Sequence, residues 1–110
     1  MKTTERSVKE YITADGRNHF RIWHGGLKDK KAQAKIDTKI ARLRLGNFGD
    51  SKSVGQGVYE IRIHFGPGYR IYYGLDGQEI VLLLCGGDKS TQEKDIKKAK
   101  TFWKTYKEGA

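Results

Sequence analysis

Charged and aromatic side chains alternate with apolar ones between residues 59 and 73, which read YEIRIHFGPGYRIYY. Alternate side chains of a β-strand point to opposite faces, so the polar residues of each half of this segment share one face. A hairpin through residues 66–68 would bring the two polar rows side by side. One wall then holds an acid, an imidazole, two guanidiniums and a phenol, a set suited to chemistry on a phosphodiester. Its members are Glu60, Arg62, His64, Arg70 and Tyr72.

These residues also have structural interpretations that need no chemistry. Arg62 and Arg70 could form surface ion pairs with nearby acids, and His64 could be an ordinary exposed strand residue. Tyr72 could pack within the sheet, as aromatic residues of strands commonly do. The pattern alone leaves both interpretations open.

Metal chemistry has little support in the sequence. The histidines at 19, 24 and 64 do not have the spacing of a zinc site with the single Cys85. We therefore expect no metal and no other cofactor. Cys85 ends an apolar segment and is expected to be an inert core thiol.

The balance of charge indicates a phosphate-rich partner. The chain has 110 residues, which suits one domain over residues 1–110, and 22 Lys and Arg residues against 13 Asp and Glu residues give a net charge of +9. Such an excess favours nucleic acid first, and an acidic membrane surface or protein second. No apolar run approaches the roughly 20 residues of a membrane span, and the N-terminus lacks a signal-peptide core. With a lone cysteine, we expect a cytoplasmic protein that does not bind membranes.

The first half of the chain predicts the elements that would support the polar wall. Residues 8–13 predict a strand and residues 18–27 a short helix. Apolar residues at spacings of four, four and three predict a longer helix over residues 29–45, with a glycine stop after it. We expect a polar loop over residues 47–56.

The second half of the chain predicts a meander and a final helix. The two alternating strands are followed by a tight turn at residues 75–78 and then by EIVLLLC, residues 79–85. Because that segment does not alternate, we expect a strand buried on both faces. Ser90, with Glu93 three residues later, has the form of a capping box for the last helix. The expected buried stripe of that helix consists of Ile96, Ala99, Trp103 and Tyr106.

The predicted order is strand, two helices, three antiparallel strands and a helix, which makes a small α+β fold with a mainly antiparallel sheet. This order, with ARLRLGNFGD at residues 41–50, GPGYRIYY at 66–73 and LLLCGGDKS at 82–90, resembles the RelE/ParE toxin superfamily. Within that superfamily the chain is most similar to the HigB-like "addiction module killer protein" group. The resemblance covers nearly the whole chain and implies a RelE-like fold.

The resemblance implies a function in RNA cleavage. Toxins of the RelE type enter the decoding site of the ribosome and cut the bound messenger RNA without metal, and a partner antitoxin silences each of them. The HigB-like group is usually paired with a small helix-turn-helix antitoxin. We therefore expect two partners: the ribosome, through ribosomal RNA and A-site messenger RNA, and a cognate antitoxin of that kind.

The resemblance also indicates which residues act. Arg70 corresponds to the arginine that holds the scissile phosphate, and Lys89 to the basic residue after the last strand. Arg62 and Glu60 take alternate positions on the strand that carries basic catalytic residues in RelE. The chain departs from RelE in two places: Glu60 stands where RelE has a lysine, and Asp95 falls near a late tyrosine.

Metal-free RNA cleavage needs a base for the 2′-hydroxyl, cations for the phosphorane and an acid for the departing 5′-oxygen. Arg62 and Arg70 suit the phosphate, because guanidinium groups pair bidentately with its oxygens. Glu60 or His64 could be the base. The acid could be Lys89, or His64 if Glu60 is the base.

Further residues are expected to contact RNA outside the chemical step. Tyr72 could stack on an RNA base or orient the phosphate. The basic residues of the second and last helices could be merely solvated, but their excess over acids favours contact with ribosomal RNA. The RNA-contacting residues expected there are Lys35, Lys39, Arg42, Lys94 and Lys98.

Two other functions stay open. Members of the ParE type act on DNA gyrase, and a gyrase inhibitor would not need the face that carries Arg62 and Arg70. A plain RNA-binding module is the third possibility, because the helix, three strands and helix of the tail are similar to double-stranded-RNA-binding domains. Those domains carry their basic cluster at the start of the last helix, whereas here it is spread along the helix, which favours the toxin.

Overall fold

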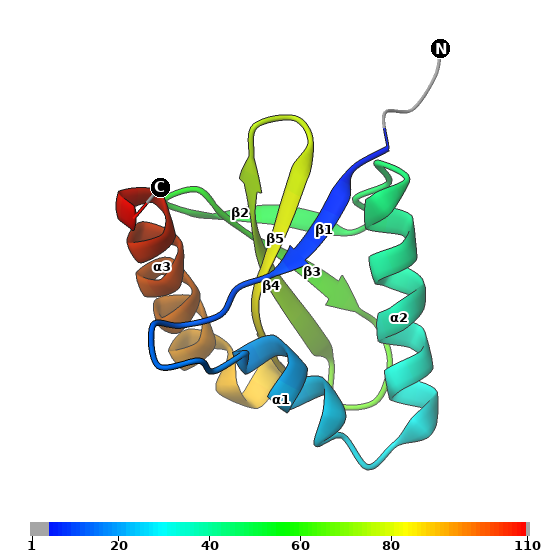
Figure 1. The fold of residues 1–110 in the computed structure, drawn as a ribbon. Coiled ribbons are helices and arrows are strands. Elements are labelled where there is room, and N and C mark those ends of the chain that lie inside the picture. Colours follow the sequence, from blue (N-terminus) through cyan, green and yellow to red (C-terminus); the bar gives the residue numbers. More distant parts are fainter. Residues whose placement is uncertain (1–4, 110) are drawn as a thin grey trace.

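The computed structural model describes residues 5–109, which form one sheet with helices on both of its faces (Figure 1). Its elements in chain order are β1 (Ser7–Glu10), α1 (His19–Gly25), α2 (Lys30–Arg44), β2 (Ser51–Gly55), β3 (Val58–Ile63), β4 (Tyr69–Asp76), β5 (Ile80–Gly87), a 3-10 turn (Lys89–Thr91) and α3 (Gln92–Gly109).

The sheet has five strands in the order β1-β5-β4-β3-β2. Strands β2 to β5 pair antiparallel with their neighbours in sequence, whereas β1 pairs parallel with β5. The expected α+β fold is therefore confirmed, with a mixed sheet. The strand expected to be buried on both faces is β5: Leu83 packs on the side of α2, while Leu82 and Leu84 pack on the side of α3.

Helix α2 covers one face of the sheet together with α1. The Asp29 carboxylate caps α2 by accepting a hydrogen bond from the backbone N–H of Lys31, at 2.9 Å. The apolar stripe of α2 is then turned toward alternate residues of β3 and β4, because these point to a common side. The buried stripe consists of Ala32, Ile36, Ile40 and Leu43, and it packs with Ile61, Ile63, Ile71 and Tyr73.

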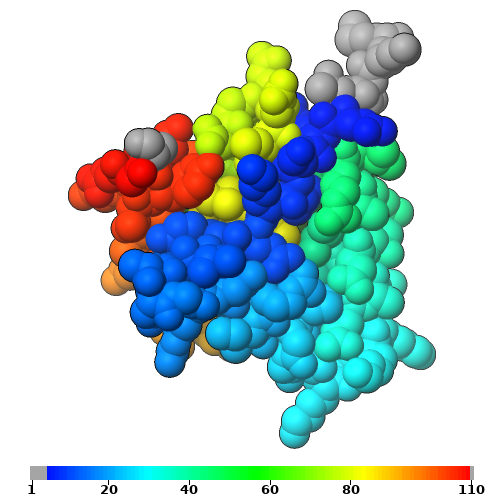
Figure 2. Space-filling model, viewed as in Figure 1, coloured from blue at the N-terminus to red at the C-terminus, as the bar shows by residue number. Residues whose placement is uncertain are grey.

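Helix α3 covers the other face, with Ala99 and Trp103 buried as predicted. The Trp103 ring lies so close to β4 that a Cβ atom on Gly74 would fall 2.3 Å from it, so this position admits only glycine. The connection from β1 to α1 also packs on α3 (Figure 2), where the rings of Tyr11 and Phe102 lie 5.2 Å apart.

Strand β2 replaces the polar loop expected over residues 47–56. Its sequence, SKSVG, has no apolar alternation, and the strand lies at the edge of the sheet. Pairing with β3 holds it in place, with Ser51 opposite Ile61 and Lys52 opposite Glu60. The prediction was wrong because this pairing is with another segment and leaves no local pattern.

The start of the last helix also differs from the prediction. Asp88, and not Ser90, is the capping residue: its carboxylate accepts from the backbone N–H of Ser90 at 2.8 Å, and the Thr91 hydroxyl accepts from the backbone N–H of Asp88 at 3.2 Å. This box closes the 3-10 turn, so that α3 begins at Gln92.

Candidate functional site

Arg62 and Arg70 lie side by side at the end of the β3–β4 hairpin, where they are directly paired residues of the two strands. Together with His64 and Lys89 they line a pocket with a volume of about 190 Å³. The turn after β5 brings in Lys89, whose backbone N–H donates to the carbonyl of Pro67 in the hairpin loop at 3.4 Å. Four of the five predicted catalytic residues thus meet in one pocket.

The fifth, Glu60, lies on the same face of the sheet and has no exposed surface. Its Oε1 lies 3.2 Å from Nε of Arg62. Its Oε2 accepts hydrogen bonds from the Tyr72 hydroxyl at 2.9 Å and from the Gln92 amide at 2.8 Å, and it lies 3.5 Å from Nε of Arg70. The buried carboxylate is therefore surrounded by donors, as its burial requires.

The pKa directions agree with an ionised Glu60. Burial raises the pKa of this carboxyl, but hydrogen bonds from Gln92, Tyr72 and Arg62 outweigh burial and hold the pKa below its ordinary value. Burial and the hydrogen bond to Glu60 both raise the pKa of the Tyr72 phenol, which stays a neutral donor. One negative charge is thus held between two guanidiniums.

The roles predicted for Tyr72 and Glu60 do not fit their burial. Tyr72 has no exposed surface, so it cannot stack on an RNA base. Glu60 is enclosed by its four partners and cannot take a proton directly from a substrate hydroxyl. Alternation predicted the correct face of the sheet for both residues. The burial of their side chains depends on the start of α3, where the Gln92 amide reaches Glu60.

His64 lies just beyond the end of β3, and its side chain is 73% exposed. Its Nε2 lies 2.6 Å from Oδ2 of Asp50, and this hydrogen bond lowers the pKa of the Asp50 carboxyl. The backbone carbonyl of Asp50 also accepts from the N–H of Arg62 at 3.1 Å. Strand alternation does not predict Asp50 as part of the site, because Asp50 precedes β2 and lies outside the alternating segments. Its only signal was its place at the end of the ARLRLGNFGD segment.

The basic residues of α2 lie next to this pocket. Lys35, Lys39 and Arg42 line a hollow of about 330 Å³ that also includes His64. His64 is thus shared by both hollows. We call the two together the basic groove; its cationic side chains are Lys35, Lys39, Arg42, Arg62, Arg70 and Lys89.

Lys98 is not brought to the basic groove, whereas Lys94 lines a hollow of about 570 Å³ at the start of α3 together with Lys89. Lys94 and Lys98 both line another hollow, of about 290 Å³, between α1 and the start of α3. Asp88 and Asp95 line the same hollow, so that its charge is mixed. The RNA-binding residues predicted on the two helices therefore fall into two groups, of which the α2 group adjoins the arginines.

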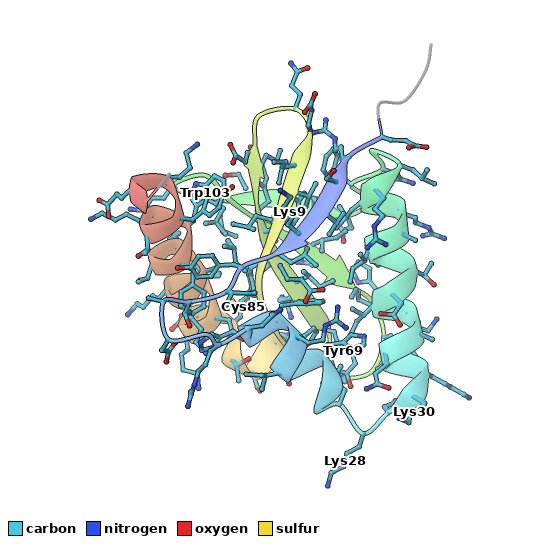
Figure 3. All side chains as sticks on the ribbon, viewed as in Figure 1. Lys9, Lys28, Lys30, Tyr69, Cys85 and Trp103 are labelled. Atoms are coloured by element: carbon cyan, nitrogen blue, oxygen red, sulfur yellow. The ribbon has the colours of Figure 1, made fainter. Side chains whose placement is uncertain are left out.

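The thiol of Cys85 is buried in the core, as expected, and burial with the nearby Asp95 raises its pKa to about 12 (Figure 3). Lys28 and Lys30, at the connection between α1 and α2, are exposed and point away from the body of the molecule (Figure 3).

Within residues 5–109, no group of three His, Cys, Asp or Glu side chains is placed to hold a metal ion. None of the helices in this range is long and apolar enough to cross a membrane.

Comparison with known proteins gives matches that extend over most of the chain. Residues 27–107 match the family described as "Phage derived protein Gp49-like (DUF891)". An uncharacterized protein of Haemophilus influenzae is 56% identical over 81 residues, which are 74% of this chain and 82% of that protein. No solved structure matches.

Proposed function

Because this chain belongs to the Gp49-like family, which is related to the HigB toxins, we propose that it is the toxin of a type II toxin-antitoxin pair. Its activity in this proposal is ribosome-dependent, metal-independent cleavage of messenger RNA. The observation that supports it most is the pair of adjacent guanidiniums, Arg62 and Arg70, on one buried carboxylate. The family match includes every residue of the basic groove.

The charges of the pocket suit a phosphodiester. The cations of Arg62, Arg70 and Lys89 line the pocket, and the buried Glu60 carboxylate beside the two arginines balances one of these charges, which leaves an excess of positive charge. Negative charge grows on the phosphorus oxygens as the phosphorane forms, and fixed cations stabilise that state more than the ground state. In the proposal Arg62 and Arg70 hold the phosphate, and Glu60 holds the arginines.

The burial of Glu60 leaves His64 as the base. Its imidazole is exposed and lines the same pocket as the two arginines, and a ring nitrogen of a neutral imidazole can accept a proton. His64 takes the proton of the 2′-hydroxyl, and the 2′-oxygen attacks phosphorus. The bond from phosphorus to the 5′-oxygen then breaks, leaving a 2′,3′-cyclic phosphate. The departing 5′-oxygen takes its proton from Lys89, which lines the same pocket.

The α2 side of the basic groove would bind the flanking RNA. Lys35, Lys39 and Arg42 continue the line of cations from His64 along α2. Contacts of this kind attract the phosphate backbone without reading its sequence. The partners in this proposal are therefore the ribosome with its A-site messenger RNA and a cognate antitoxin, a small helix-turn-helix protein.

Induced expression with mapping of RNA ends tests the proposal. We expect growth arrest and new RNA ends within translated frames, both lost in Arg62→Ala and in Arg70→Ala. Arg17→Ala is the matched control. Arg17 is exposed, lies outside the basic groove and forms only a long ion pair, with 3.9 Å between its Nε and Oδ2 of Asp15. Full toxicity of both groove variants would show that Arg62 and Arg70 are not part of a catalytic site. Intact messages beside inhibited DNA supercoiling would instead indicate a gyrase inhibitor.

A further inference from the structure

Gln92, the first residue of α3, is half-buried and reaches the arginine pair from a distant part of the chain. Its side-chain amide donates to Oε2 of Glu60 at 2.8 Å, across 32 positions of sequence. Nothing in the local sequence marks this glutamine, because its partner lies on β3. Gln92 is nevertheless the residue that connects the start of α3 to the arginines.

The two arginines are bound to Glu60 unequally. Arg62 donates from Nε to Oε1 at 3.2 Å. Nε of Arg70 is buried without a hydrogen bond to any residue between 5 and 109, and its distance to Oε2 is 3.5 Å. Oε2 already accepts from two neutral donors, Gln92 and Tyr72. Those donors occupy the oxygen that Arg70 would otherwise bind.

We infer that Gln92 is a positioning residue: by occupying Oε2 of Glu60, it prevents a close ion pair with Arg70 and leaves that guanidinium to a bound phosphate. The inference rests on the proposed function, in which the pocket receives a phosphodiester. Gln92 acts only through Glu60, and Tyr72 assists it on the same oxygen.

The physical reason is competition for one buried carboxylate. A buried anion needs donors, and charged donors form shorter and stronger hydrogen bonds than neutral ones. If the Gln92 amide were absent, the nearest donor able to replace it would be the Arg70 guanidinium. A close pair would then neutralise Arg70, whose Nη1 is already bound to the Gly68 carbonyl at 2.8 Å. The phosphate would lose one of its two guanidinium partners.

The test compares inorganic phosphate binding by the wild type and by Gln92→Met, which keeps a similar side-chain length but has no donor. NMR of the arginine Nε–H signals reports both binding and the state of Arg70. We expect phosphate to bind about five- to twentyfold more weakly to Gln92→Met, since a hydrogen bond to a charged group is at stake. Without phosphate, the Arg70 Nε–H should exchange more slowly with solvent in the variant.

Gln33→Met is the matched control, because the Gln33 amide donates to the backbone carbonyl of His24 at 3.0 Å and does not line the basic groove. It should bind phosphate like the wild type. If Gln92→Met does not fold, Tyr72→Phe provides the test. This variant removes the other neutral donor from Oε2 of Glu60 and should also weaken phosphate binding. Wild-type affinity with an unchanged Arg70 signal in the folded variant overturns the inference, as does a wild type that does not bind phosphate.

The outcomes separate this inference from the proposed nuclease. If Gln92→Met binds phosphate more weakly but the wild type cleaves no RNA on ribosomes, the positioning role of Gln92 is supported and the proposed nuclease activity is excluded. If the wild type cleaves RNA and Gln92→Met binds phosphate as the wild type does, the nuclease activity is supported and the positioning role of Gln92 is excluded.

Discussion

The β3–β4 hairpin has two faces made by alternate residues of the same strands, and they differ in what they bury. Toward α2 it presents Ile61, Ile63 and Ile71, which join a continuous apolar core. Toward α3 it presents Glu60 and Arg70, two of the buried charged residues of the described chain. Backbone geometry is shared by the two faces, so the difference lies in the side chains alone.

The charged residues distinguish the two faces in stability, although the α3 face also buries apolar side chains such as Val58. Burial of apolar surface stabilises the α2 face directly. On the α3 face, desolvation of the charges offsets much of their mutual attraction, and a buried ion pair is often no better than a well-packed apolar pair. Stability therefore gives little reason for these charges, whereas binding of a phosphate gives a clear one.

The largest effect on stability is expected for Glu60→Ala. Removal of the buried carboxylate leaves Arg62 and Arg70 without their shared partner, and the free energy of unfolding should fall by about 3–5 kcal/mol. Urea unfolding monitored by circular dichroism measures this change. A loss below about 1 kcal/mol would contradict the view that Glu60 holds both arginines.

Ile71→Ala is the corresponding change on the α2 face, and it should come second. Ile71 has no exposed surface, and truncation of such a side chain costs about 2–4 kcal/mol. The variant that remains folded should bind phosphate like the wild type, because Ile71 points away from the pocket. If Ile71→Ala lost as much phosphate affinity as Arg70→Ala, phosphate binding would not be a property of the α3 face alone.

A smaller effect is expected from pH. The pKa of Glu60 is lowered in the folded state, so the stabilisation it gives is fully present above its ordinary value of 4.5 and is lost as pH falls through the lowered pKa. Urea unfolding of the wild type and of Glu60→Gln between about pH 3 and pH 7 measures it. Their difference in free energy of unfolding should shrink on acidification, and a constant difference would exclude an ionised Glu60.

The sequence predicted which face of the hairpin each residue lies on, but it did not predict which of these side chains are buried. Alternation placed Glu60, Arg62, Arg70 and Tyr72 on one side, and the β3–β4 pairing confirms that arrangement. That Glu60 and Tyr72 are buried was not predictable, because the residue that covers Glu60 is Gln92, at the start of α3. Strand periodicity is local, whereas burial depends on segments that are distant in sequence.

The same limit applies to Asp50 and to β2. Asp50 reaches His64 across 14 positions, and the polar strand β2 exists through its pairing with β3. By contrast, α2 was predicted from its own apolar stripe, since the four residues that carry that stripe are the buried ones. Elements that encode their contacts within one segment were predictable, and contacts between segments were not.

The smallest effect on stability is expected for Asp50→Asn. The pair of Asp50 and His64 is exposed, with side-chain exposures of 54% and 73%, and exposed pairs contribute little. Unfolding should be unchanged within error, while RNA cleavage should slow, because His64 loses the carboxylate that orients its ring. Asp15→Asn, another exposed acid outside the basic groove, is the control and should keep the wild-type rate.

Cleavage of a message bound in the A site of purified ribosomes tests the role of the arginine pair most directly. We predict that Arg70→Ala reduces the rate at least about a hundredfold, as expected when a fixed cation is removed from a developing oxyanion, and that Arg17→Ala does not change it. Cleavage by Arg70→Ala at the wild-type rate would contradict the account, because the α3 face of the hairpin would then not be the site of the chemistry.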